Sequence, residues 1–256
     1  MLHNIALTLT VVPLLVSLVV GLPTVTDSPN KQAEERAAYE RRVAPLKAAG
    51  IDTNSTEQVI SALKDTRIGV RLAAVYLLRE KRAKSAVGEL RKLLDDPHKV
   101  PLLLLEVCSA LAELETDSVT WKVPCRRLVD EESDPMIQMR AAGVLARHGD
   151  AKGWKLVRTS LLSSQKADLE EAAMVAPFFD GLIPDPSAGG TKIHVLAVCA
   201  VAFREANEES QTLLLGVIAK TAQPQDAEAI LSLVPFAKSQ YAKDSITAVV
   251  NQLRHR

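Results

Sequence analysis

Apolar residues recur at helical spacing along most of the chain. Two apolar stripes run along residues 68–78: Ile68, Leu72 and Val75 form one, and Val70, Ala74 and Leu77 form the other. Two stripes suit a helix that packs both on a hairpin partner and on the next pair of helices. The pattern continues with breaks at typical helix lengths, and no short alternating run predicts a strand. The predicted helices cover residues 30–50, 56–64, 67–81, 83–94, 99–115, 118–130, 135–148, 150–163, 166–179, 191–206, 208–221, 225–237 and 240–254.

Composition agrees with packed helices. Hydrophobic residues make up 47% of the 256 residues, which is enough for a sizeable core, whereas only 4% are aromatic. Sandwiches and barrels favour aromatic and β-branched residues, so a chain rich in Ala, Leu and Val is predicted to be all-α. Eleven glycines are few, which makes tight hairpins scarce.

Charge weighs against one class of function. The chain has 31 basic and 31 acidic residues and a formal net charge of zero. Nonspecific nucleic-acid binding normally needs a basic excess, so the sequence argues against nucleic acid as the partner. A zero net charge still leaves room for a local basic patch.

The first thirty residues differ from the rest. Residues 5–22, IALTLTVVPLLVSLVVGL, form an uncharged apolar run, and the first acid and the first lysine or arginine are Asp27 and Lys31. The run is intermediate in length between a signal-peptide core and a minimal membrane span, and Pro13 would kink a spanning helix. We therefore expect export to a periplasmic or extracellular location, either with cleavage after Gly21 or with residues 5–22 kept as a membrane anchor. A buried first helix is the alternative, and the charged segment that follows argues against it.

Capping signals mark the start of the helical region. Gly50 ends the charged helix of residues 30–50, where a left-handed cap favours glycine. Asn54 followed by Glu57 has the spacing of a capping box for the next helix. The same asparagine begins Asn54-Ser55-Thr56, an acceptor pattern for glycosylation, but a plain helix cap is the simpler interpretation.

One short sequence motif occurs twice. Asp65 is followed six residues later by Arg71, and Asp134 by Arg140, and each arginine leads into an apolar helix. A helical hairpin cannot bury its apolar surface alone, so a repeated hairpin predicts stacked copies. We expect each acid to cap the second helix of its hairpin, or to pair with an arginine of the adjacent repeat.

A third, weaker copy lies between these two, where Asp95 precedes Val100-Pro101. The three acids therefore recur at unequal intervals of about 30 to 40 residues, which fall within the range of helical repeats. Pro101 stands where the other copies have arginine, which interrupts a continuous ladder of arginines.

These motifs resemble the HEAT family of helical repeats over about residues 55–165. The matching residues are Asp65 with Val70-Arg71-Leu72-Ala73-Ala74, Asp134 with Met139-Arg140-Ala141-Ala142, and Gly149-Asp150 at the end of the second unit. The resemblance implies a right-handed α-solenoid of stacked antiparallel helical hairpins, HEAT- or armadillo-like, whose concave face holds a protein or peptide. Some members of the family bind nucleic acid or carry enzymatic sites.

The patterns divide the chain into four segments. Residues 1–29 form the signal peptide or anchor, and residues 30–180 hold the first helix and the HEAT-like repeats. Residues 181–190, GLIPDPSAGG, contain two prolines and three glycines, so they form a connector loop. Residues 191–256 are predicted to hold degenerate helical repeats on helix periodicity alone.

No catalytic, metal or cofactor site is predicted. No two of the five histidines are three or four residues apart, and none is followed by glutamate. Zinc sites and the His-Glu iron sites of repeat hydroxylases therefore lack their ligands. His194 on an apolar helix is interpreted as a packing residue. Residues 181–190 precede a helix, but they lack the lysine-serine pair of a phosphate loop.

Two of the three cysteines are candidates for a disulfide. Cys108 and Cys125 lie midway along two consecutive predicted helices, so a turn near residues 116–117 makes them face each other across one hairpin. An exported chain permits a disulfide there, and two small buried residues are the alternative. Cys199 lies in an apolar stretch and is predicted to be core.

Two tryptophans occupy similar places. Trp121 and Trp154 each fall in the first turn of a predicted outer helix, one repeat length apart. They pack against the neighbouring hairpin or present an aromatic edge to a partner, and the sequence leaves both open. Arg126 and Arg158 lie on the same helices and join the tryptophans as candidate partner-facing residues. Further basic residues there are Lys122, Arg127, Lys152 and Lys155.

The sequence therefore favours a non-enzymatic scaffold, exported or tethered to a membrane, that holds another protein or peptide in a concave groove. A nucleic-acid-binding or base-excision module of similar helical repeats is one alternative. A lyase of the HEAT type is another, but no residue stands out for its chemistry.

Overall fold

The computed structural model describes residues 29–95, 100–115, 120–181, 189–190 and 192–255, and the regular elements in these ranges are all helices. The predicted all-α class is confirmed. The α-helices are α2 (Pro29–Ala48), α3 (Thr56–Ser61), α4 (Ile68–Glu80), α5 (Val87–Leu94), α6 (Pro101–Leu114), α7 (Lys122–Glu131), α8 (Pro135–Arg147), α9 (Ala151–Leu161), α10 (Lys166–Val175), α11 (Val195–Glu205), α12 (Glu208–Thr221), α13 (Ala227–Leu231) and α14 (Gln240–Arg254). Short 3₁₀ helices are η1 (Ala62–Lys64), η2 (Lys84–Ala86), η3 (Ala176–Phe178), η5 (Pro224–Asp226) and η6 (Val234–Phe236).

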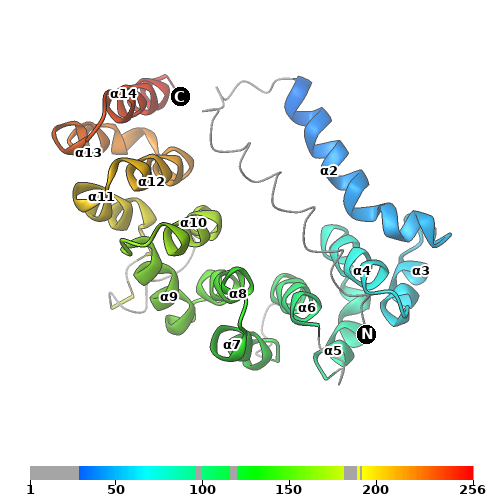
Figure 1. The fold of residues 1–256 in the computed structure, drawn as a ribbon. Coiled ribbons are helices and arrows are strands. Elements are labelled where there is room, and N and C mark those ends of the chain that lie inside the picture. Colours follow the sequence, from blue (N-terminus) through cyan, green and yellow to red (C-terminus); the bar gives the residue numbers. More distant parts are fainter. Residues whose placement is uncertain (1–28, 96–99, 116–119, 182–188, 191, 256) are drawn as a thin grey trace, which may run out of the picture.

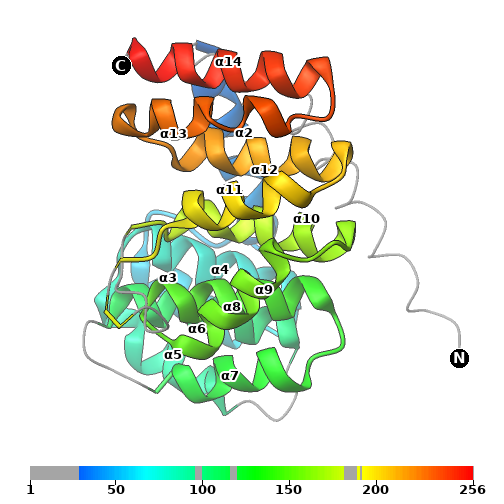
Figure 2. The ribbon, with the colours of Figure 1, turned by 90° about the vertical axis from the view of Figure 1, so that its left-hand side faces the viewer.

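The helices follow one another along an arc in chain order (Figure 1). The inner helices are α4, α6, α8, α10, α12 and α14, and each packs on the next. The outer helices are α3, α5, α7, α9, α11 and α13. At one end of the arc α2 packs on α4, and at the other end α14 carries the C-terminus. Figure 2 shows α11 to α14 stacked as successive layers.

Packing between near neighbours explains one of the two apolar stripes of α4. Val70, Ala74 and Leu77 are all buried, because α4 contacts α2, α3 and α6. In the other stripe Val75 is buried, whereas Leu72 is partly buried and Ile68 is exposed. The inner helices α6, α8, α10 and α12 are each covered by an outer helix and by inner helices on both sides. The residues that these contacts leave uncovered are partly or fully exposed.

Most helix boundaries agree with the sequence prediction. The predicted helix at 208–221 and the one at 240–254 match α12 and α14 in both bounds. The predicted helix at 225–237 is wrong as a single element, because it divides into η5, α13 and η6. Proline has no amide hydrogen to donate to the backbone hydrogen bonds of an α-helix, and Pro224 and Pro235 lie in the two short 3₁₀ helices.

The first hairpin corrects one predicted cap. Gly50 has φ +72°, the left-handed conformation expected at the end of α2. Asn54, however, does not cap α3. The helix starts at Thr56, so Ser55 is the N-cap and its Oγ accepts a hydrogen bond from the amide of Gln58 at 3.3 Å. Asn54 instead donates its own amide to Oδ1 of Asp52 at 2.9 Å.

Asp95 also has a role other than the predicted one. It is the C-cap of α5, whereas α6 begins at Pro101 with Val100 as its N-cap. Helix α6 therefore starts with a proline, whose missing amide costs nothing at a first helical position. Asp95 lies at the end of the outer helix and is not the counterpart of Asp134, which directly precedes α8.

Small residues bring α8 and α9 into close contact. A Cβ atom on Gly153 of α9 would lie 2.5 Å from the carbonyl oxygen of Ala142 and 2.6 Å from Cβ of Leu145. Ala142 and Leu145 on α8 are fully buried. Glycine at position 153 is therefore a steric requirement of this helix pair.

Candidate functional site on the inner helices

The partly exposed side chains of the inner helices form a regular strip. The outer helices cover the opposite side of these helices, so the strip opens toward the inside of the arc (Figure 1). On α4, α6 and α8 its members recur every 34 residues. One position holds Leu72, Glu106 and Arg140, and another holds Arg79, Glu113 and Arg147.

Glu106 joins three consecutive inner helices. Its Oε1 accepts a hydrogen bond from Arg140 on α8, and its Oε2 lies 3.4 Å from Nη1 of Arg79 on α4. The same nitrogen of Arg79 donates to Oγ of Ser109 at 3.1 Å. The side chains of Glu106 and Arg79 are only 17% and 19% exposed, so their attraction is weakly screened. We call Arg79, Glu106 and Arg140 the ladder.

Aromatic contacts extend the ladder to α2. The ring of Tyr76 on α4 lies between two guanidinium groups, 4.7 Å from that of Arg42 and 5.7 Å from that of Arg79. Tyr39 on α2 adds a tilted ring contact with a centroid separation of 6.4 Å. Cations over an aromatic face are attracted by its quadrupole, so Tyr76 connects the arginines of α2 and α4.

The strip continues with ion pairs of a more exposed kind. Arg147 of α8 lies 3.8 Å from Glu113 of α6. Lys166 at the start of α10 hydrogen-bonds Glu209 of α12, and this bond raises the pKa of Lys166. These ion pairs place charges of both signs on the inner helices.

The two aspartates of the repeated motif have different roles. Asp134 is the N-cap of α8, and its Oδ1 accepts from the amide of Met136 at 2.9 Å. Asp65 instead binds Arg67, whose amide and guanidinium both donate to it at 2.8 and 2.7 Å. Arg67 lowers the pKa of Asp65 to about 2. Neither carboxylate takes part in the ladder.

Arg71 and Arg140 differ in helical register. Equivalent positions on α4, α6 and α8 are 34 residues apart, as Glu106 and Arg140 are. By this spacing Arg71 corresponds to Leu105 and Met139, which are both buried, and not to Arg140. A shift of one residue turns a side chain by about 100° around the helix. The two arginines of the repeated motif therefore lie on different faces of their helices, and only Arg140 belongs to the ladder.

Both tryptophans are buried, which favours packing against a neighbouring hairpin over an exposed aromatic edge. Trp121 is 2% exposed and Trp154 is 1% exposed. Trp121 packs edge-on against His148 with a centroid separation of 5.1 Å, and Trp154 packs in the same way on Phe179 at 5.9 Å. The large rings fill the spaces between adjacent hairpins, where burial of apolar area is most favourable.

Part of the basic surface on α7 and α9 is neutralised. Nε of Arg126 donates to Oδ2 of Asp150 at 2.9 Å, and Asp150 also caps α9 through the amide of Lys152 at 3.0 Å. The ammonium group of Lys152 binds Asp130. Arg158 is exposed on α9. Arg126 thus stabilises the junction of two outer helices and offers less charge to a partner than the sequence indicates.

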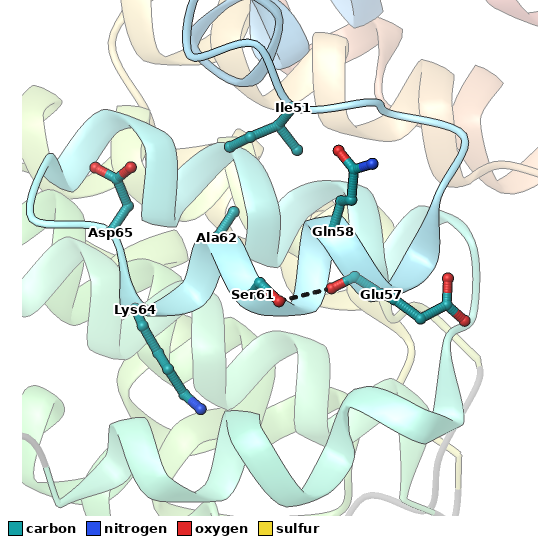
Figure 3. Close-up of a pocket in the computed structure, with 7 residues that line it drawn as sticks. All are labelled: Ile51, Glu57, Gln58, Ser61, Ala62, Lys64 and Asp65. Atoms are coloured by element: carbon teal, nitrogen blue, oxygen red, sulfur yellow. Dashed lines mark hydrogen bonds between the residues drawn. The ribbon is translucent and has the colours of Figure 1, made fainter.

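A shallow hollow of about 480 Å³ is lined by Ile51 and by residues of α3 and η1 (Figure 3). Its polar groups bind one another or near neighbours: Ser61 donates to the carbonyl of Glu57 at 3.0 Å, and Lys64 lies 3.1 Å from Glu89. Figure 3 shows the side chains of Lys64 and Glu57 pointing away from Ile51. The polar side chains that line the hollow are therefore engaged in local hydrogen bonds and ion pairs.

The described residues also contain no cluster of three or more histidine, cysteine or acidic side chains that could hold a metal ion. Burial raises the pKa of Cys199 to about 12, so its thiol stays protonated near neutral pH. Burial lowers the pKa of His148, and the nearby Arg147 and Lys122 add to this effect. The candidate site is therefore the inner strip, whose members recur at a constant spacing on α4, α6 and α8.

Sequence reasoning missed Glu106, the central residue of the ladder. The available signal was its offset of 34 residues from Arg140, which the unequal intervals between the three aspartates concealed. Aspartates in turns drift with loop length, whereas side chains on packed helices keep their register.

Comparisons with known proteins do not identify the chain. No family model matches the sequence, and no curated protein matches it either. Within the described ranges, no helix combines the length and apolar character that crossing a membrane requires. Residues 5–22, the candidate leader or anchor, lie outside the described residues.

Proposed function

We propose that this chain is a non-enzymatic binding scaffold, a right-handed HEAT-like α-solenoid, and that its inner face holds a segment of another protein. The observation that carries the proposal is the strip of partly exposed side chains at a constant spacing of 34 residues on α4, α6 and α8. Units that pack mainly on their neighbours form a long surface, and a constant spacing offers an extended partner evenly placed contacts.

The chemistry of the inner face favours a polypeptide of mixed character. Ile68, Leu102 and Met136 occupy equivalent positions at the N-terminal ends of α4, α6 and α8, and all three are at least partly exposed. Beside this apolar row lie the charges of the ladder. Interfaces combine apolar anchors with a polar rim, so we propose a partner segment with apolar side chains next to charges of both signs.

Site-specific crosslinking in the source cells tests the proposal. A photoreactive residue is placed at position 113 or 147 on the inner helices, and at position 155 or 158 on the outer helix α9 as a matched control. All four native side chains are exposed. We expect irradiation to join a defined polypeptide to the inner positions only. Adducts of equal yield at the outer positions, or no adduct at the inner positions, would contradict the proposal.

Affinity measurements with the purified full chain and the captured polypeptide follow. Arg147→Glu should weaken binding at least about tenfold if the charge contacts the partner, and Arg158→Glu should change it less than about twofold. Equal losses for the two variants would place the partner elsewhere. Thermal melts of both variants separate a loss of contact from a loss of folding.

We further propose that residues 5–22 direct the chain out of the cytoplasm or anchor it in a membrane. The support is the uncharged apolar run and the charged segment that follows it. Fusion of residues 1–29 to a reporter that is active only after export provides the test. A fused reporter that stays in the cytoplasm would overturn this part of the proposal.

A further inference from the structure

Cys108 on α6 and Cys125 on α7 are brought together in the interior of one hairpin. Both side chains are fully buried, and α6 packs on α7. The sulfur of Cys125 lies 3.5 Å from the carbonyl oxygen of Ala141 on α8, so the pair sits where three helices meet. In the structure both residues are thiols.

The two thiols are direct neighbours. A hydrogen bond with Cys108 is the largest cause that raises the pKa of Cys125, and burial adds to it. Axes of packed helices are about 8–10 Å apart, and small side chains at the contact allow the shorter separations. A disulfide needs Cα atoms about 4.4–6.8 Å apart, and facing positions on two closely packed helices can provide this separation.

We propose that Cys108 and Cys125 form a disulfide that locks α6 to α7 when the chain folds under oxidising conditions, and that the structure with two thiols is the reduced form. With oxidised glutathione as oxidant, one cysteine thiolate attacks the disulfide of glutathione, forms a mixed disulfide and releases one glutathione thiolate. The second cysteine thiolate then attacks the mixed disulfide and releases another. Two protein thiols lose two protons and two electrons, and one glutathione disulfide becomes two thiols.

Burial makes this exchange depend on folding. Attack needs a thiolate that reaches the oxidant, and in the folded chain both sulfurs are shielded. The bond therefore forms while the hairpin is open, and the folded protein then protects it from reduction. Cys199 is an internal control, because it is equally buried but lies on α11, far along the chain from the pair.

Refolding of the full chain from urea in a mixture of oxidised and reduced glutathione tests the proposal. Alkylation after denaturation should label one cysteine, and peptide mapping should identify it as Cys199. The variant Cys199→Ala should then show no reactive thiol. Cys108→Ser and Cys125→Ser should each retain two. Three labelled cysteines in the refolded wild-type chain, or a bridge that contains Cys199, would overturn the proposal.

Thermal melts test the locking effect. The bond closes a loop of about 17 residues, which is expected to raise Tm by at least about 5 °C in the oxidised chain. The same rise should appear in Cys199→Ala and be absent from Cys108→Ser. A bridge that lowers Tm would contradict a lock between α6 and α7.

Discussion

Arg140 on α8 donates a hydrogen bond to the carboxylate of Glu106 on α6, 34 positions earlier in the chain. The other oxygen of Glu106 faces Arg79 on α4. One acid thus holds two guanidinium groups that come from the helices on either side of it. A single residue therefore links the charges of three inner helices, in addition to their apolar packing.

Removing the carboxylate should destabilise the fold. Glu106→Ala is expected to lower the free energy of unfolding by about 1–3 kcal/mol, because it removes the carboxylate that pairs with Arg79 and Arg140 in a partly shielded place. Urea unfolding gives the value. Glu113→Ala is the matched control on the same helix, since Glu113 is 40% exposed and 3.8 Å from Arg147, and it should cost less than about 1 kcal/mol. Equal costs would show that the ladder contributes no special stability.

The buried cap of α9 should matter more than the exposed cap of α8. Asp150, whose side chain is 2% exposed, caps α9 and binds Arg126, whereas Asp134 caps α8 from the surface. Asp150→Ala is expected to cost about 2–4 kcal/mol, and Asp134→Ala about 1 kcal/mol. Chemical unfolding of the two variants under the same conditions compares them. A smaller loss for Asp150→Ala would mean that burying this carboxylate offsets its hydrogen bonds.

Two glycine substitutions should have opposite effects. Gly153→Ala places a Cβ atom 2.5 Å from the backbone oxygen of Ala142, so the helices must separate, and we expect a loss of about 1–3 kcal/mol. Gly216→Ala in the middle of α12 meets no atom within 4 Å and should stabilise the chain by up to about 1 kcal/mol through helix propensity. Melting temperatures of the two variants measure the expected loss and the expected gain in stability. A tolerated alanine at 153 would contradict the close contact of α8 and α9.

His148 should make the fold less stable in mild acid. Its pKa is lowered from the ordinary 6.5, first by burial and then by Arg147 and Lys122. Between the lowered pKa and 6.5 the unfolded chain binds more protons at this residue than the folded chain does, so stability falls as pH drops through this window. His148→Phe keeps a ring against Trp121 and removes the proton site.

The measurement compares unfolding free energies at pH 7.5 and 5.5. The wild-type chain should lose more stability than His148→Phe over this interval. Identical losses would show that other groups cause the acid sensitivity. His255→Phe, near the exposed C-terminal end of α14, controls for the general effect of replacing a histidine by phenylalanine.

The sequence alone determined the helices and their order. Apolar spacing, caps and prolines act within a few residues, so α12, α14 and the glycine cap after α2 could be located without a structure. Errors arose where two local signals competed, as at Asn54 and Ser55, because neighbouring residues can both cap a helix.

Only the tertiary structure decided which side chains meet. The sequence places Glu106 and Arg140 on helices, but their contact depends on how far each helix is shifted and rotated against its neighbour. Packing between hairpins likewise brings Trp121 and Trp154 inside the fold, although the sequence left a partner-facing position open. Periodicity within one helix fixes which residues share a face. The relative register of two helices follows from the packing of all their contacts, and no single segment of sequence contains that information.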